Sequence, residues 1–250
     1  MYRERRSNLA GAVVWERRAV VGTGLVRVLP DGCMDLLWHD GQLVIAGPDT
    51  RAHLVRDRPG AVHVGLRFAP GVGPGVFGLP ASELRDQRVP VDEIWPRPEA
   101  ARLAELLANA EEAGRARVLE AAVAARLRVA EERPACGDAY EPVPPYARVV
   151  AGLRAGGTVA ALAREVGLSE RQLHRRCLTA FGYGPKTLAR VLRLGRALDL
   201  ARAGVAWAEV AARAGYADQA HFSREVRALA GVPLTELLPP PAQSRDGCEP

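Results

Sequence analysis

The sequence predicts an α+β protein in two parts. The amino-terminal part is expected to be a small antiparallel β sandwich or barrel with helices, and the carboxy-terminal part an all-α domain of two helix-turn-helix units. Three observations support this prediction. Short apolar runs alternate with turn sequences over residues 25–68, Ala, Leu, Glu and Arg dominate from Pro98, and one pattern occurs twice after Thr158. A chain of 250 residues is long enough for two domains with separate cores.

Four segments of the first part have the pattern of β-strands. They are residues 25–29, 34–38, 43–46 and 62–68. Asp40 and Gly41 separate the second segment from the third, and this pair favours a hairpin because both residues tolerate positive φ. In the fourth segment apolar residues alternate with polar or small ones, which is typical of a half-buried strand. Several short strands joined by turns favour a sandwich or a barrel.

The chain between these strands and the repeated pattern is expected to be mostly helical. Residues 69–79 are rich in Gly and Pro and should form a loop, and a short helix should follow over residues 80–86. Two helices separated at Gly114 are expected within residues 98–132, as a connector or dimerisation segment. The proline-rich residues 133–145 are typical of an interdomain linker. The predicted domains are therefore residues 1–97 and 146–238, followed by a disordered tail over residues 239–250.

The repeated pattern occurs at residues 161–177 and again at residues 209–226. In each copy an alanine is followed four residues later by a glycine, which suits a helix that ends at a residue with positive φ. A polar residue that can cap the next helix comes shortly afterwards, Ser169 in the first copy and Asp218 in the second. Each copy therefore predicts a helix, a turn and a second helix, and one long helix over residues 185–203 should separate the copies.

The charge is divided unevenly between the two parts. Residues 1–142 hold 19 Arg against 20 acidic residues, and residues 143–250 hold 15 Lys and Arg against 9, so the net charges are −1 and +6. The basic excess coincides with the repeat, as expected for a domain that binds nucleic-acid phosphates. The four cysteines have no C-x-x-C spacing, so neither a disulfide framework nor a zinc ribbon is expected. No signal peptide or membrane span is recognisable, and a cytoplasmic location is expected.

The second copy reads GYADQAHFSREVRALAG, and RLGRA lies in the long helix before it. These stretches are similar to the signature GFxDxSxFxRxFKxxxG and to the linker helix of the AraC/XylS family of bacterial transcription regulators. The resemblance covers residues 145–238 and implies a sequence-specific DNA-binding transcription factor that is not an enzyme and acts as an activator or a repressor. Val226 and Ala230 stand where the family has bulky aromatic residues. The core of the second unit is therefore expected to repack around Trp207 and Leu229.

The same resemblance implies partners and site residues. The partners are double-stranded promoter or operator DNA, RNA polymerase, an unidentified small-molecule effector and a second copy of the chain, with no membrane and no cofactor. The location implied is the bacterial nucleoid in the cytoplasm. Residues placed to reach base edges are Arg171, His174, Arg175, Gln219, Ser223 and Arg224. Residues placed at phosphates are Ser169, Arg176, Lys186, Asp218, His221 and Arg227.

The stretches VLPDGCMDLLW, AGPDT and GLRFAPGVGP also look like an amino-terminal domain of uncharacterised members of this family. Residues 1–97 are therefore expected to be a sensory or regulatory domain. Six polar residues are candidates to line a pocket or to bind a metal: Asp31, Cys33, Asp35, His39, His53 and His63. The alternative is structural, with Asp31 and Gly32 in a turn and Cys33 as a small buried residue.

Two other classes of function compete with a transcription regulator. A metal-dependent cupin enzyme needs two closely spaced histidines on one strand, and the sequence contains no H-x-H pattern. An alkyl acceptor of the DNA-repair type would use Cys33, which needs activating neighbours that the sequence does not identify. No G-x-S-x-G motif, phosphate-binding loop or dinucleotide-binding glycine pattern occurs, so no catalytic residue and no metal ligand are assigned.

Overall fold

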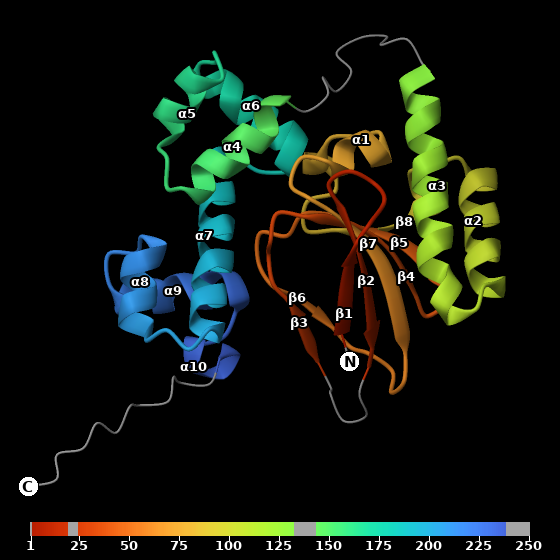
Figure 1. Cartoon of the computed structure of the whole chain (residues 1–250), viewed down its shortest axis with the longest axis horizontal. Helices are drawn as coiled ribbons and strands as arrows, with labels where there is room; N and C mark the ends of the chain where they lie inside the picture. Colours follow the sequence, from red (N-terminus) through yellow and green to blue (C-terminus); the bar gives the residue numbers. More distant parts are fainter. Residues whose placement is uncertain (1, 20–24, 133–143, 239–250) are drawn as a thin grey trace, which may run out of the picture.

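The computed structural model describes residues 2–19, 25–132 and 144–238 (Figure 1). The predicted α+β architecture is confirmed, because an antiparallel sheet domain precedes a helical domain. The predicted tail at residues 239–250 and residues 133–143 of the predicted linker lie outside the described residues. Among the helices that are described, none combines the length and the apolar composition that a membrane span requires.

Six strands form one antiparallel sheet in the order β1-β2-β7-β4-β5-β8, and β3 pairs with β6 in a two-stranded ribbon. The strands are β1 (Tyr2–Arg6), β2 (Ala12–Arg18), β3 (Val26–Val28), β4 (Met34–His39), β5 (Gln42–Ala46), β6 (His53–Val55), β7 (Val62–Phe68) and β8 (Arg88–Pro90). The predicted hairpin joins β4 to β5, and both of its turn residues, Asp40 and Gly41, have positive φ.

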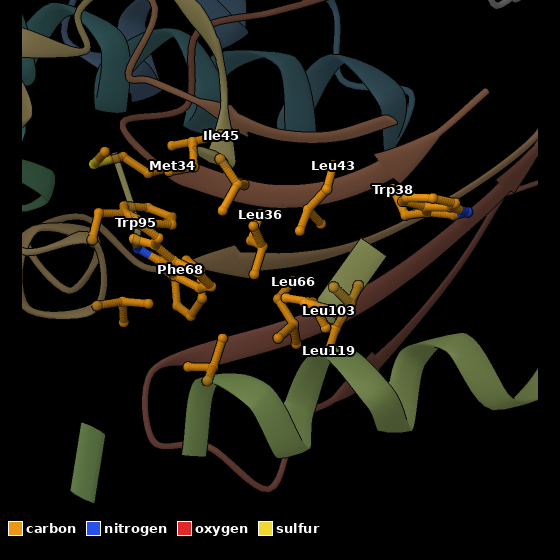
Figure 2. Close-up of a cluster of buried hydrophobic side chains, with 14 of the residues drawn as sticks. Met34, Leu36, Trp38, Leu43, Ile45, Leu66, Phe68, Trp95, Leu103 and Leu119 are labelled. Atoms are coloured by element: carbon orange, nitrogen blue, oxygen red, sulfur yellow. The ribbon is translucent and has the colours of Figure 1, made fainter. Parts of the chain in front are cut away.

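The hydrophobic core of the first domain lies between one face of the sheet and helices α2 (Arg97–Asn109) and α3 (Glu112–Glu132) (Figures 1 and 2). Leu36, Ile45 and Leu66 contribute from the strands, and Leu103 and Leu119 from the helices. Every second residue of a strand reaches this face, because side chains alternate along the strand. The two helices expected within residues 98–132 thus complete this core, and their role in dimerisation stays a prediction.

Several local predictions for this domain are wrong. Residues 69–79 contain the short helix α1 (Gly73–Phe77), in which Pro74 occupies the first turn, where its fixed φ suits a helix. Gly114 lies inside α3, and α2 ends instead at Ala110, whose backbone is extended. The helix expected over residues 80–86 is only the 3-10 turn η1 (Ala81–Glu83).

The alternation over residues 62–68 predicts a half-buried strand, but both faces of β7 are covered. His63, on the face opposite the core, is only 3% exposed. The sequence patterns also do not predict β1, β2, β6 or β8, nor the 3-10 turn η2 (Val91–Glu93). β1 carries only exposed residues and therefore lacks the alternation by which a strand is recognised.

The second domain consists of seven helices within the described residues. They are α4 (Pro144–Arg154), α5 (Val159–Glu165), α6 (Glu170–Phe181), α7 (Pro185–Arg202), α8 (Trp207–Ala214), α9 (Gln219–Ala230) and α10 (Leu234–Leu237). The predicted long helix is α7. Its first half, with Leu188 and Val191, belongs to a core shared with α4, α5 and α6, and its second half, with Leu194 and Leu198, belongs to a core shared with α8, α9 and α10.

The core of the second unit is not centred on Trp207. Trp207 is only partly buried at the edge of this core, whereas Phe222 is fully buried and contacts Tyr216 at its centre. Leu229 is buried as expected. Trp207 stands in the first turn of α8, at one end of the unit, and this position leaves part of its ring in solvent.

Candidate nucleic-acid interface and interdomain cavity

The first helix-turn-helix unit consists of α5 and α6, and its turn has the predicted chemistry. Gly167 has positive φ after α5, and Ser169 begins α6 with a capping box in which Ser169 and Gln172 satisfy each other's backbone N–H groups. Leu173, Cys177 and Ala180 of α6 are buried in the first core. The exposed side of α6 therefore carries only polar and charged residues near its beginning.

The second unit consists of α8 and α9 and repeats this arrangement. Gly215 ends α8 with positive φ, and the Asp218 carboxylate caps α9 by accepting a hydrogen bond of 2.6 Å from the backbone N–H of His221. Phe222 and Val226 are fully buried in the second core. In both units the second helix, here called the recognition helix, thus buries one face and leaves the other exposed.

The residues predicted to read bases lie on the exposed sides of the two recognition helices. On α6 they are Arg171, His174 and Arg175, and on α9 they are Gln219, Ser223 and Arg224; all are exposed except Ser223, which is half-buried. The imidazole of His174 lies against Gly184, where an added Cβ would stand 2.5 Å from its Cε1. His174 therefore also packs on the turn between α6 and α7.

The residues predicted to meet phosphates divide into two groups. Ser169 and Asp218 cap α6 and α9. The ring nitrogen Nδ1 of His221 accepts from the backbone N–H of Ala217 at 3.3 Å, just before α9. Lys186 and Arg227 are exposed on α7 and α9, and Arg176 is half-buried on α6. These long cationic side chains suit contacts with the DNA backbone, because they reach several ångströms beyond the helix surface.

Helix α7 connects the two units through polar contacts as well as through the cores. Arg190 forms two hydrogen bonds of 2.9 and 3.0 Å with Glu225 of α9, and this pairing lowers the pKa of Glu225. The guanidinium of Arg193 lies 5.5 Å from the ring centroid of Tyr216. Arg196 donates to the last carbonyl of α8, that of Ala214, at 2.6 Å. The second unit is therefore held to the linker helix at three points.

The amino-terminal domain contacts the carboxyl ends of both recognition helices. Arg85 Nη1 donates to the carbonyl of Gly182, which ends α6, at 3.3 Å. At the end of α9, Arg27 Nη1 donates to the carbonyl of Ala230 at 2.6 Å, and the backbone N–H of Ala52 donates to the carbonyl of Leu229 at 2.7 Å. The carboxyl end of a helix has free carbonyl groups and a partial negative charge, which a guanidinium stabilises.

A cavity of about 1020 Å³ separates the second face of the six-stranded sheet from α7. All six polar residues that the sequence singled out line this cavity: Asp31, Cys33, Asp35, His39, His53 and His63. The turn of the structural alternative is also present, because Gly32 has positive φ and the Cys33 N–H donates to Asp31 Oδ1 at 2.8 Å, whereas Cys33 is only half-buried. The turn therefore places Asp31 and Cys33 at the edge of the cavity.

Burial shifts the pKa values of two titratable groups in this cavity, Asp35 and Cys33. Burial raises the pKa of Asp35 to about 6, against the opposing effect of Arg67. Burial also raises the pKa of the Cys33 thiol well above its usual value, and Asp31 and Asp35 raise it further. A reactive cysteine needs the opposite environment, one that stabilises the thiolate. Within the described residues, no three metal-binding side chains gather in one place.

Sequence reasoning missed several residues of this region. Trp15, Arg67 and Arg88 line the cavity, and Arg27 and Arg85 reach the recognition helices. The alternation in residues 62–68 places Arg67 on the same strand face as His63, so the sequence pattern could have identified Arg67 as a residue of this cavity. Nothing in the local sequence distinguishes Arg27 or Arg85 from other surface arginines.

Two family models match the chain. One is described as a helix-turn-helix domain and matches residues 162–238, and the other is described as a domain of unknown function (DUF6597) and matches residues 12–90. No curated protein matches the chain. The two matched ranges lie within the helical domain and the sheet domain, respectively.

Solved structures of ToxT from Vibrio cholerae are similar to the chain at low sequence identity. An apo variant is 11% identical with a TM-score of 0.48, and the match covers 93% of this chain and 98% of ToxT. ToxT bound to an unsaturated fatty acid is 12% identical with a TM-score of 0.45, over 93% and 96% of the two chains. ToxT bound to (E)-4-(8-methylnaphthalen-1-yl)but-3-enoic acid is 10% identical with a TM-score of 0.46, over 91% and 98%.

Proposed function

Because the chain carries an AraC-type helix-turn-helix domain after an amino-terminal DUF6597 domain, we propose that it regulates transcription by binding a specific DNA sequence with both of its units. One observation carries this proposal. Two recognition helices with exposed polar faces are joined by the single rigid helix α7, in the part of the chain that has a net charge of +6. Such an arrangement suits two major grooves on one side of a duplex.

The geometry of the two units defines the expected DNA site. Successive major grooves on one side of B-DNA are separated by roughly 34 Å, or one helical turn. A single chain should therefore cover an asymmetric site with two parts, and should not require a palindrome. Arg175 and Arg224, at matching positions of α6 and α9, are proposed to read guanines in the two parts. Lys186, Arg176 and Arg227 are proposed to hold the phosphates.

Selection of binding sites from random DNA, followed by footprinting with the full chain, tests this proposal. Two protected segments about one helical turn apart are expected. Lys186→Ala should weaken binding to all sequences alike and reduce the salt dependence by about one phosphate contact. Glu105→Gln, on the exposed side of α2, is the matched control and should leave DNA binding unchanged. Protection of one groove only, or no enrichment of any sequence, would contradict the proposal.

The amino-terminal domain is proposed to control this DNA binding. Three features support the idea: Arg85 contacts the end of α6, Arg27 contacts the end of α9, and the cavity between the sheet and α7 is large enough for a small molecule. A molecule that binds one arrangement of the two domains better than another changes the population of each arrangement. A preference of about tenfold corresponds to about 1.4 kcal/mol, which is enough to change occupancy of a DNA site.

A further inference from the structure

The two faces of the six-stranded sheet have different chemistry. One face is apolar and packs on α2 and α3, and the other carries charged, aromatic and polar residues and faces the cavity. Strand β4 shows the division, because Leu36 points into the core while Asp35 and Leu37 line the cavity. The opposite wall is the side of α7 that carries Val191, Leu192 and Leu198, with the charged residues Arg196, Asp199 and Arg202 further along the helix. The cavity is thus bounded by both domains.

One end of the cavity has an excess of negative charge. Glu4, Asp31 and Asp35 surround the single guanidinium of Arg67, at distances of 3.2, 3.6 and 3.4 Å. Three carboxylates against one cation leave a formal charge of −2 at this end. Two further arginines of the six-stranded sheet line the cavity, and both are already paired, Arg17 with Asp57 and Arg88 with Asp49.

The carboxylates at this end also have unused hydrogen-bonding capacity. Asp35 accepts a hydrogen bond from the indole N–H of Trp15, and its contact with Arg67 Nε is longer than a good hydrogen bond. The buried Nε atom of Arg67 has no hydrogen-bond partner among the described residues. An ionised carboxylate offers about four acceptor sites, so a ligand with N–H groups finds acceptors here that the protein leaves open.

An aromatic surface lies beside these carboxylates. The Trp15 indole lies flat on Gly65, where an added Cβ would stand 2.5 Å from its Cε2 atom, so a larger residue at Gly65 would displace the ring. Tyr2 stacks on Trp15 with a centroid distance of 6.4 Å. Faces of Trp and Tyr rings attract cations, because the ring quadrupole is negative on the face.

We propose that this cavity binds an organic cation, a molecule with a protonated amine or guanidinium on an apolar body. The cationic group lies at Glu4, Asp31 and Asp35, and the apolar body lies between Trp15 and the Val191 side of α7. As the effector of the proposed regulation, such a molecule contacts the sheet and the linker helix at the same time. An anionic ligand at this end would meet three carboxylates and would have to displace one of them from Arg67.

A set of three matched probes tests the charge preference: 2-phenylethylamine, 2-phenylethanol and 3-phenylpropionate. They share a phenyl group and a short chain and differ mainly in the charge of the end group. Calorimetric titration and thermal denaturation of the full chain should show binding of the amine at least about tenfold tighter than binding of the carboxylate. The alcohol should lie between the two. Equal or tighter binding of the carboxylate, or no binding of the amine, would overturn the proposal.

Isosteric variants test the location of the cation. Asp31→Asn and Asp35→Asn keep the acceptor oxygens for the Cys33 N–H and the Trp15 N–H but remove the negative charge. The double variant should lose the amine preference of about tenfold, whereas Glu105→Gln on α2 should keep it. If the double variant does not fold, Glu4→Gln on the exposed strand β1 should reduce the preference by a factor of about three. Unchanged amine binding in these variants would overturn the location.

The DNA-binding assay separates this inference from the proposed function. A chain that selects a DNA sequence but ignores the amine contradicts only the ligand class. A chain that binds the amine through Asp31 and Asp35 but selects no DNA contradicts the proposed function and leaves the cation site intact. Amine binding that alters neither DNA affinity nor its salt dependence would show that the site is not an effector site.

Discussion

The two helix-turn-helix units follow one sequence pattern, offset by 49 residues, but the amino-terminal domain holds them differently. At the end of α6, Gly182 is enclosed, and an added Cβ would stand 2.6 Å from Pro48 Cγ and 3.1 Å from the carbonyl oxygen of Ala81. At the end of α9, the corresponding Gly231 has only the Arg27 guanidinium nearby, at 3.4 Å. The end of α6 is thus docked mainly by packing, and the end of α9 is attached mainly by hydrogen bonds, although Leu29 of the first domain also packs against the second core.

This difference distinguishes the internal structure of each helix-turn-helix unit from its attachment to the amino-terminal domain. The repeat determines the shape of each unit through its caps, glycines and buried positions, which match between the copies. The attachment to the first domain depends on residues outside the repeat, namely Arg85 and η1 for the first unit and Arg27 and Ala52 for the second. The exposed sides of both recognition helices are basic, with Arg171 and Arg175 on α6 and Arg224 and Arg227 on α9.

The largest expected effect comes from truncating one buried side chain in each of the two cores. Phe222→Ala should destabilise the second unit by about 3–5 kcal/mol, and the matching Leu173→Ala should destabilise the first by about 2–5 kcal/mol, because both side chains are buried. Chemical denaturation measures the loss, and footprinting should show that each variant loses one half of the site first. Exposed Arg213→Ala is the control, with an expected change within about 0.5 kcal/mol. Equal loss of both halves in both variants would show that the units do not fold separately.

The two glycines at the ends of the recognition helices test the difference in docking. Gly182→Ala adds a clash at the domain interface to the strain of positive φ. The variant should therefore be destabilised by about 2–4 kcal/mol. Gly231→Ala introduces only the backbone strain of positive φ and should be destabilised by about 1–2 kcal/mol. Limited proteolysis and thermal denaturation of the two variants should therefore show domain separation only for Gly182→Ala. Similar behaviour of the two variants would remove the distinction between packed and hydrogen-bonded attachment.

The arginines proposed to read bases test whether the two units contribute separate parts of the DNA site. Arg175→Ala and Arg224→Ala should each relax preference at a different base pair, by about 1–3 kcal/mol of discrimination, because an arginine pairs bidentately with guanine. Binding-site selection with each variant measures this change. Arg227→Ala serves for comparison, since a phosphate contact should weaken all sequences equally. An unchanged selected motif for Arg175→Ala would show that α6 does not read bases at this position.

The smallest expected effect concerns the arginines that cap the recognition helices. Arg27→Ala removes a hydrogen bond of 2.6 Å to the carbonyl of Ala230 and should cost about 1–2 kcal/mol of interdomain stability. Arg85→Ala removes a longer bond of 3.3 Å and should cost under about 1 kcal/mol, because packing also holds Gly182. Hydrogen exchange at the ends of α6 and α9 measures both losses. A larger effect for Arg85→Ala would reverse the comparison.

Much of the fold is readable from local sequence. The caps at Ser169 and Asp218, the hairpin at Asp40 and Gly41, and the buried positions of the recognition helices all follow from the residues themselves. These features depend on neighbours a few positions away, so a short stretch contains the needed information. The strand β1 is the contrary case, since its residues are exposed and only pairing with β2 makes it a strand.

The tertiary structure alone decided how these parts meet. Sequence reasoning selected the six polar residues, and the tertiary structure brings them from β4 and β7 of the sheet, from β6 of the ribbon and from the turn before β4 to one cavity against α7. Arg27 and Arg85 reach their carbonyl partners across 203 and 97 residues of chain. Contacts of this length depend on how two finished domains dock, and no propensity or periodicity of a single stretch encodes the docking. The sequence by itself determined two helix-turn-helix units, and the packing of the domains determined which residues of the first domain contact them.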